Sequence, residues 1–343
     1  MPPKRRVMGS DRHRWISALG LLVGVSAVAR AQTVLVGGIQ YESPSLIAPV
    51  AVLSARRGDA TEWRAGVAGW TASGSWTRTL SPSRALWAGV EVTPMNAHSS
   101  NKLYVDGVED PALAYRNATM QIGGGLRLTP SSRWTTEVRG VVLQEKVSDL
   151  PEQVGEFWRS PFVGLDIAQR YDRLSAEDMI RSRFEGIRVA ARAQVYGGTS
   201  SWSRGTVSLG VGRRAGRVFL RANGSAFRGN SLNTVSAFLT GGSWDAAGPM
   251  ALYGYSHGAF RVDRAVLANG GADVRLWGNT EVGVRAAWLA SPGETHRGTA
   301  LSLSTLWSGI GISAAVALPE DDGFRGRWDR AIVTGGVTAA ILR

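Results

Sequence analysis

The chain has 343 residues, with 39 basic and 27 acidic side chains, a formal net charge of +12 and no cysteine. The absence of cysteine excludes a disulfide framework and a thiolate metal site. The Lys and Arg residues are dispersed singly through apolar segments instead of clustering on one face, which argues against a nucleic-acid binder.

The first 31 residues have the composition of a cleavable secretory signal. Five basic residues precede Trp15, an apolar run continues to Ala29, and Ala29-Arg30-Ala31 forms an Ala-x-Ala end, as is typical of such signals. The apolar run is shorter than the roughly 20 residues of a spanning helix, and no further apolar run of that kind follows. We expect residues 1–31 to be removed on export, which leaves 32–343 as the mature chain with a net charge of +7.

Apolar and polar residues alternate with a period of two along the mature chain, which predicts β-strands with two unlike faces. The alternation is clearest in four segments: 120–128, 133–142, 187–195 and 281–288. The apolar face often carries Ala or Gly, whereas a soluble sandwich would bury larger residues, and the polar face carries both charge signs. The pattern therefore favours strands between lipid and a polar lumen.

Sixteen strands can be placed along the chain: 33–42, 46–56, 61–72, 75–80, 85–95, 113–128, 133–147, 161–172, 184–196, 202–212, 217–240, 261–277, 280–290, 298–307, 309–318 and 329–341. The split near Gly74 is the least distinct boundary, and merging the two segments leads to a fourteen-stranded alternative. An even number of strands returns both ends of the barrel to the same side of the membrane.

The connections between these strands differ in length. The short turns are 81–84, 129–132, 213–216, 278–280 and 308–309. The longer connections are 96–112, 148–160, 241–260, 291–297 and 319–328. Trp87, Trp134, Trp277 and Trp307 lie beside short turns, where an interfacial aromatic girdle is expected.

We therefore predict an all-β fold, a single-domain transmembrane antiparallel β-barrel of 16 strands. The expected location is the outer membrane of a Gram-negative-type cell, in contact with its lipid and lipopolysaccharide. Charged residues on the polar faces should point into the lumen: Arg127, Glu137, Arg139, Arg188, Arg192, Arg204, Asp273, Arg275, Glu281 and Arg285. They could fill the interior as cross-strand pairs or, in an open lumen, favour anions, and the pairing account is preferred.

The stretch 238–277 carries a family resemblance. It contains Phe238-Leu239-Thr240-Gly241-Gly242, then Leu252-Tyr253-Gly254-Tyr255, then a long alternating strand with Asp273-Val274-Arg275-Leu276. This order resembles the bacterial surface antigen barrel of the BamA/TamA outer-membrane assembly-factor superfamily. In that family a strand ends in Phe-x-x-Gly-Gly, and the next loop carries a Val/Leu-Arg-Gly-Phe/Tyr tetrad and folds back into the lumen.

The resemblance implies a barrel that assists insertion or translocation of proteins or lipids, with client membrane proteins as candidate partners. It also implies that 252–255 packs against the inner wall, and we expect tyrosine hydroxyl groups to bond Asp273, Arg275 or Glu281. The chain departs from the family at Tyr253, which replaces the arginine. Strands begin almost at the predicted cleavage site, so no periplasmic POTRA domains are expected. The alternatives are a passive anion-preferring channel and a structural surface barrel whose loops bind partners.

Enzyme chemistry is not expected. The residues 254–258 match Gly-x-Ser-x-Gly, but a nucleophile elbow needs a helix after the serine, and 259–267 shows no helical pattern. The mature histidines His98, His257 and His296 fall in separate loops without zinc-ligand spacing, and the acidic loop residues lack the spacing of a calcium loop. We expect no catalytic residue, no metal site and no cofactor.

Overall fold

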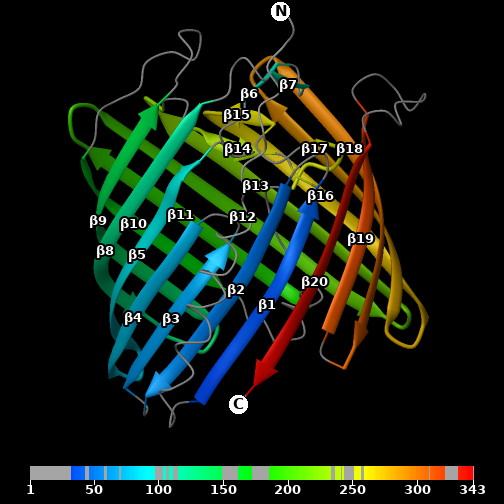
Figure 1. Ribbon diagram of the computed structural model, residues 1–343, viewed down its shortest axis with the longest axis horizontal. Coiled ribbons are helices and arrows are strands. Elements are labelled where there is room, and N and C mark those ends of the chain that lie inside the picture. Colours follow the sequence, from blue (N-terminus) through cyan, green and yellow to red (C-terminus); the bar gives the residue numbers. More distant parts are fainter. Residues whose placement is uncertain are drawn as a thin grey trace, which may run out of the picture.

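The computed structural model of the chain is a closed antiparallel β-barrel (Figure 1). The structure describes residues 32–42, 46–57, 60–68, 71–96, 103–105, 108–110, 115–148, 161–171, 185–232, 236–240, 242, 251–255, 259–308, 310–320 and 331–342. The predicted signal, residues 1–31, lies outside these ranges and stays a prediction. No helix among the described residues is long and apolar enough to cross a membrane.

Sixteen strands form the barrel, and each pairs with the next in chain order. They are β1(Gln32–Glu42), β2(Leu46–Arg57), β3(Thr61–Ala68), β4(Thr71–Ser81), β5(Arg84–Asn96), β8(Arg116–Leu128), β9(Trp134–Ser148), β10(Phe162–Tyr171), β11(Gly186–Gly197), β12(Ser201–Ala215), β13(Val218–Asn230), β16(Arg264–Trp277), β17(Thr280–Ser291), β18(Glu294–Trp307), β19(Ile310–Pro319) and β20(Ile332–Leu342). Two small hairpins lie outside this sheet: β6(Leu103–Val105) with β7(Val108–Asp110), and β14(Phe238–Thr240) with β15(Phe260–Val262). The prediction of a sixteen-stranded all-β barrel is confirmed.

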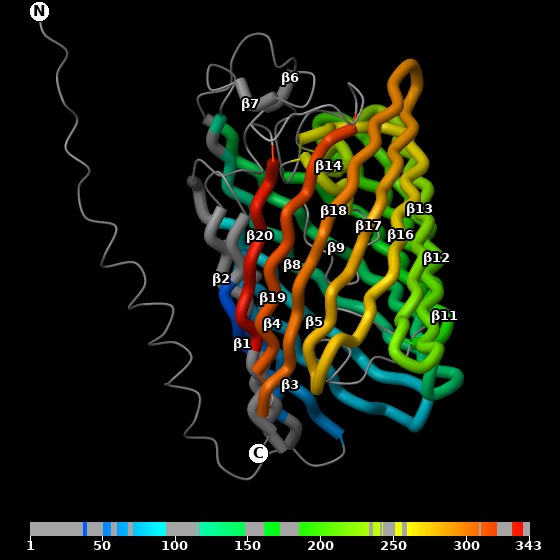
Figure 2. The backbone as a smooth tube through the Cα atoms, turned by 90° about the vertical axis from the view of Figure 1, so that its right-hand side faces the viewer, coloured from blue at the N-terminus to red at the C-terminus, as the bar shows by residue number. Residues whose placement is uncertain are grey.

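The first and last strands close the barrel. β1 and β20 pair from Val34 opposite Leu342 to Glu42 opposite Thr334, and Figure 1 shows the two strands side by side. Figure 2 shows β16 to β20 following one another along the wall. This closing pair covers nine positions in register, whereas β19 and β20 pair over eight. Closure removes the unpaired strand edges that an open sheet would expose.

The two faces of each strand differ as the alternation predicts. In β17, Glu281, Arg285 and Leu289 are buried on the inner side, while Val284 and Trp288 between them are exposed on the outer side. Exposed Val, Leu and Ile side chains continue on the outer faces of most barrel strands. An apolar outer band around a polar interior is the arrangement of a barrel that lies in lipid.

Two strand boundaries differ from the prediction. The split predicted near Gly74 lies earlier, because β3 ends at Ala68 and β4 begins at Thr71, which places Gly74 inside β4. The predicted strand 217–240 is also wrong, since β13 ends at Asn230. Residues 238–240 alternate like a barrel strand but pair with β15 instead.

Two predicted long connections contain ordered structure. The connection 291–297 is a tight turn at Pro292 and Gly293, because β17 and β18 continue their pairing to Ser291 opposite Glu294. Gly293 has a positive φ of 87°, which glycine adopts without the steric penalty of other residues. Within 96–112, the β6–β7 hairpin was not predicted.

The predicted tryptophan girdle is correct in part. Trp307 and Trp277 are 73% and 68% exposed, and Trp134 lies on the outer face of β9 with the exposed valines of that strand. Trp87 is out of phase with the exposed residues of β5, and its ring contacts Arg139 at 4.7 Å in the lumen. Trp87 therefore does not belong to the girdle.

Candidate functional site

Residues 251–255, called here the inward segment, lie inside the barrel after its eleventh strand. Leu252, Tyr253 and Tyr255 are 0%, 1% and 4% exposed. The segment turns back on the chain, because the main-chain N–H of Gly242 donates to the oxygen of Tyr255 at 2.8 Å and Gly242 also bridges to Leu252. Gly241 lies outside the described residues.

The inward segment packs directly on the backbone of β18 and β19. A side chain at Gly254 would collide with the backbone of Leu318 and Pro319, and Gly254 has a positive φ of 82°. A side chain at Gly298 of β18 would collide with the carbonyl oxygen of Tyr253. Glycine is therefore needed at both positions. Gly254 has a backbone conformation that favours glycine, and both Gly254 and Gly298 allow the two backbones to approach closely.

Aromatic rings hold the end of the segment. The ring of Tyr255 meets Phe260 edge-on at 5.0 Å and His296 at 5.9 Å, and Phe260 stacks on His296 at 4.0 Å. The Tyr255 hydroxyl donates to the main-chain oxygen of Arg297 at 3.2 Å. The expected partners were charged side chains of β16 and β17, so the hydrogen bond that forms is weaker than a charge-assisted one.

Two asparagines connect the segment to the wall. Asn223 of β13 stands opposite Asn269 of β16, and its side-chain nitrogen donates to the Asn269 side-chain oxygen at 2.8 Å. The Asn269 nitrogen then donates to the main-chain oxygen of Ala251 at 3.2 Å. Both are buried, and sequence reasoning missed them, although each is a polar residue at an inward position of its strand.

A first charged group runs across β8, β9, β10 and β11. Asp166 is completely buried and accepts two hydrogen bonds from Arg192, at 3.0 and 2.7 Å. Arg139 lies 3.9 Å from Asp166 and 2.8 Å from Glu137, which also pairs with Arg127 at 2.7 Å. The expected acidic partner Glu137 is present here, whereas Asp166 was missed.

A second charged group lies on β12, β13, β16 and β17. Asp273 pairs with Arg285 of β17 and lies 3.6 Å from Arg221. Glu281 pairs with Arg214 at 3.1 Å. The sequence predicted Asp273, Glu281 and Arg285 as luminal charges, but it did not predict Arg214 and Arg221. These two arginines reach the carboxylates only through the register between neighbouring strands, which the sequence of one strand does not reveal.

The other predicted arginines also reach the lumen. Arg275 lies 3.8 Å from Glu281, and Arg204 donates to Gln194 at 2.7 Å and to the main-chain oxygen of Ser236 at 2.8 Å. Arg188 stands on the same face of β11 as Gln194. In the described part of the two charged groups, every carboxylate pairs with at least one arginine, and arginines outnumber carboxylates.

The residues of the rival sites are only partly described. No group of three or more His, Asp or Glu side chains that could hold a metal ion occurs among the described residues. His296 packs against aromatic rings. Ser256, His257 and His98 lie outside the described residues, so the absence of catalysis stays a prediction.

Comparisons with known proteins show the fold. No protein-family model and no curated protein matches the sequence. BamA from Haemophilus ducreyi lacking POTRA domains 1-3 has a TM-score of 0.64 at 11% identity, over 91% of this chain and 71% of that one. CdiB from Acinetobacter baumannii has a TM-score of 0.59 at 10% identity, over 90% and 60%, and CdiB from Escherichia coli 0.57 at 12%, over 92% and 64%. The chain thus spans less than two thirds of either CdiB, and its architecture is that of outer-membrane β-barrels.

Proposed function

We propose that this barrel lies in the outer membrane and assists the insertion or translocation of proteins or lipids there. The observation that carries the proposal is the inward segment, packed on β18 and β19 after the eleventh of sixteen strands. A barrel of the same fold occurs in BamA and CdiB, and the sequence order of the segment resembles the BamA/TamA superfamily. The lack of the family arginine is offset here by ring packing and the Asn269 contact.

The seam between β1 and β20 is the place where such a barrel would act on the membrane. Gly37 and Gly38 of β1 stand opposite Ala339 and Thr338, and two further glycines of β20, 335 and 336, stand opposite β1 residues. Cross-strand side-chain pairs supply much of the stability of a sheet, and glycine contributes none. Side chains face each other on both strands at five of the nine seam positions, against nine of eleven between β1 and β2. We therefore infer that the seam opens more readily than the neighbouring β1–β2 pair.

An insertion assay tests the proposal. The purified full chain is reconstituted in phospholipid vesicles, and a urea-denatured eight-stranded barrel is added as client. Folding of the client is followed by the shift in its gel mobility between unheated and boiled samples. We expect several-fold faster folding than in vesicles that contain a trimeric porin at equal protein mass, and equal rates would contradict the proposal.

An anion-preferring channel is the second candidate, because the luminal groups contain more arginines than carboxylates. Most of these arginines are paired or packed, which leaves little free positive charge for permeating ions. Planar-bilayer recording separates the two. A large, steady, anion-selective current together with no effect on client folding would favour the channel.

A further inference from the structure

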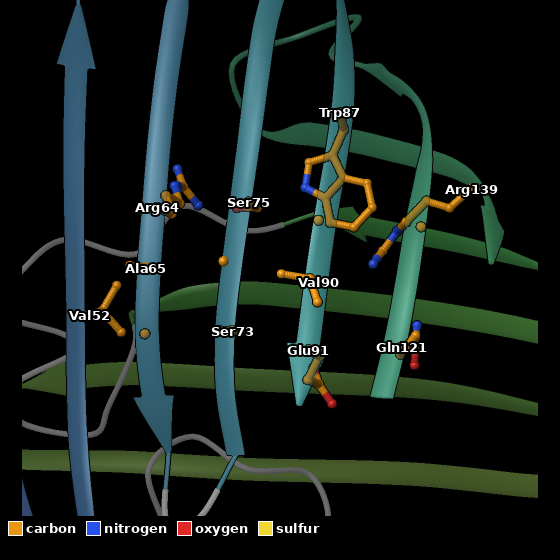
Figure 3. A pocket seen from close by; sticks show the side chains of 14 residues that line it. Val52, Arg64, Ala65, Ser73, Ser75, Trp87, Val90, Glu91, Gln121 and Arg139 are labelled. Atoms are coloured by element: carbon orange, nitrogen blue, oxygen red, sulfur yellow. The ribbon is translucent and has the colours of Figure 1, made fainter. Parts of the chain in front are cut away.

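A cavity of about 250 Å³ lies on the inner wall across β3, β4, β5 and β8 (Figure 3). In the order of strands around the barrel, this wall is opposite β16 to β19, where the inward segment packs. The described part of the inward segment therefore leaves this wall uncovered. Neither the insertion proposal nor the channel alternative uses the cavity.

The floor of the cavity consists of small residues in register. Gly66 stands opposite Ser73, and Ser75 stands opposite Gly89, which in turn faces Gly123. Five adjacent positions on four strands thus carry no side chain larger than serine. The Trp87 ring covers Gly89, so a ligand could approach the strand backbones at Gly66, Ser73 and Ser75.

The hydrogen-bond donors on one side of this floor are the side chains of Arg139 and Arg64. Arg139 of β9 lies over the ring of Trp87, as Figure 3 shows, and this ring in turn lies over Gly89, where it would collide with any side chain. The Arg139 Nε atom is buried without a hydrogen-bond partner among the described residues. Arg64 is 52% exposed even though it pairs with Glu62. Each arginine has five N–H donors, so both keep donors beyond their ion pairs.

Hydrogen-bond acceptors stand on the other side. Glu91 of β5 lies directly opposite Gln121 of β8 and next to Ser73 of β4. Among the described residues Glu91 has no hydrogen bond or ion pair. The Gln121 amide both donates and accepts, and the serine hydroxyl groups do the same.

We propose that this cavity binds a sugar residue, either free or as one unit of a longer glycan. A simple anion would meet the Glu91 carboxylate, and a simple cation would meet Arg64 and Arg139, so neither fits the whole set. A polyhydroxylated ring accepts from the guanidinium groups and donates to the carboxylate. Arg139 and Gly89 already contact the Trp87 ring, so the C–H groups of the sugar meet the part of the indole that these two contacts leave open. The volume is below the roughly 300–1,000 Å³ of sites for larger ligands, which matches a single ring.

Isothermal titration of the full chain tests this proposal. The protein is kept in an amine-oxide detergent, because maltoside detergents carry the sugar headgroup that is to be tested. The probes are maltotriose and the core oligosaccharide released from lipopolysaccharide by mild acid, with sodium sulfate and spermidine as the anion and cation probes. We expect at least one sugar probe to bind with a Kd below about 10 mM and sulfate and spermidine not to bind.

Two substitutions in the cavity lining test whether the sugar binds there. Glu91→Gln and Trp87→Leu should each weaken sugar binding by about tenfold, a loss of one charge-assisted bond or one aromatic contact. The matched controls are Glu185→Gln, an exposed carboxylate before β11, and Trp134→Leu on the outer face, which should leave binding unchanged. Because Trp87→Leu could impair folding, Glu91→Gln alone suffices for the test. Binding of sulfate or spermidine only, binding of no probe, or sugar binding that Glu91→Gln leaves intact would each overturn the proposal.

Discussion

Gly298 of β18 lies against the main-chain carbonyl oxygen of Tyr253, and no side chain would fit between β18 and the inward segment at this point. This contact joins a wall residue to a loop residue that is far from it in sequence. It fixes how closely the inward segment can approach the barrel, so changing it should release the segment while the wall stays paired.

Replacing Gly298 with valine should therefore detach the inward segment. Leu252 is completely buried, and the natural chain has no cysteine, so Leu252→Cys gives a single thiol whose modification by a water-soluble maleimide reports detachment. We expect labelling to accelerate by about tenfold or more in the Gly298→Val background, as for other local openings. Gly224→Val, at a position with open space around it, is the control and should leave labelling slow. Equal labelling in both backgrounds would contradict the packing described here.

Tyr255 separates the hydrogen bond of the segment from its ring packing. Tyr255→Phe removes the bond to the Arg297 oxygen and should cost about 0.5–1.5 kcal/mol of segment stability. Tyr255→Ala also removes the contacts with Phe260 and His296 and should cost about 3–5 kcal/mol. Hydrogen–deuterium exchange of residues 251–255 measures both. If the two variants had the same effect, ring packing would not be the main anchor.

Asp166 should be the most sensitive charge of the first luminal group. Asp166→Asn removes the carboxylate that accepts two hydrogen bonds from Arg192, while Arg139 keeps Glu137. Because Asp166 is completely buried but Arg192 is 43% exposed, we expect a loss of about 1.5–3 kcal/mol, the value of hydrogen bonds to a charged group. Glu62→Gln, which loses a pair with the half-exposed Arg64, should cost about 1 kcal/mol or less. Urea unfolding of the two variants in vesicles gives the comparison, and similar losses would show that burial does not decide the strength of these pairs.

The assignment of lipid and lumen faces can be tested on two adjacent residues of β18. Leu303 is 49% exposed on the outer face, so Leu303→Arg should cost up to about 2–4 kcal/mol, depending on its depth in the bilayer. Ser304 stands opposite Glu281 in the lumen, and Ser304→Arg should cost much less because its charge meets a carboxylate. Thermal unfolding in vesicles measures both losses of stability. A larger loss for Ser304→Arg than for Leu303→Arg would show that the lipid and lumen faces are assigned the wrong way round.

Much of the barrel could be predicted from the alternation of apolar and polar residues, because within each strand the residues that face lipid are apolar and many of those that face the lumen are polar. In β17 the inward Glu281 and Arg285 alternate with the outward Val284 and Trp288. The same reasoning could have excluded Trp87 from the girdle, since it is out of phase with the exposed Leu86 of β5.

The errors have a common cause in pairing between distant strands. Residues 238–240 look like more of β13, and only their pairing with β15 removes them from the wall. Asn269 becomes an anchor only because the register places Asn223 opposite it and the inward segment above it. Asp166 likewise becomes a shared counter-charge only when β9 and β11 flank it. Such relations depend on register, which a single strand does not encode.

Cross-linking the seam tests the central claim most directly. Ile39 and Val337 are outward residues directly opposite each other on β1 and β20, and opposed positions on antiparallel strands are close enough for a disulfide. Leu165 and Val195 form an equivalent outward pair on β10 and β11, across the barrel. We predict that oxidised Ile39→Cys/Val337→Cys slows client folding to the rate of empty vesicles and that reduction restores it. The oxidised Leu165→Cys/Val195→Cys protein should stay fully active, and unchanged folding with a locked seam would contradict the account.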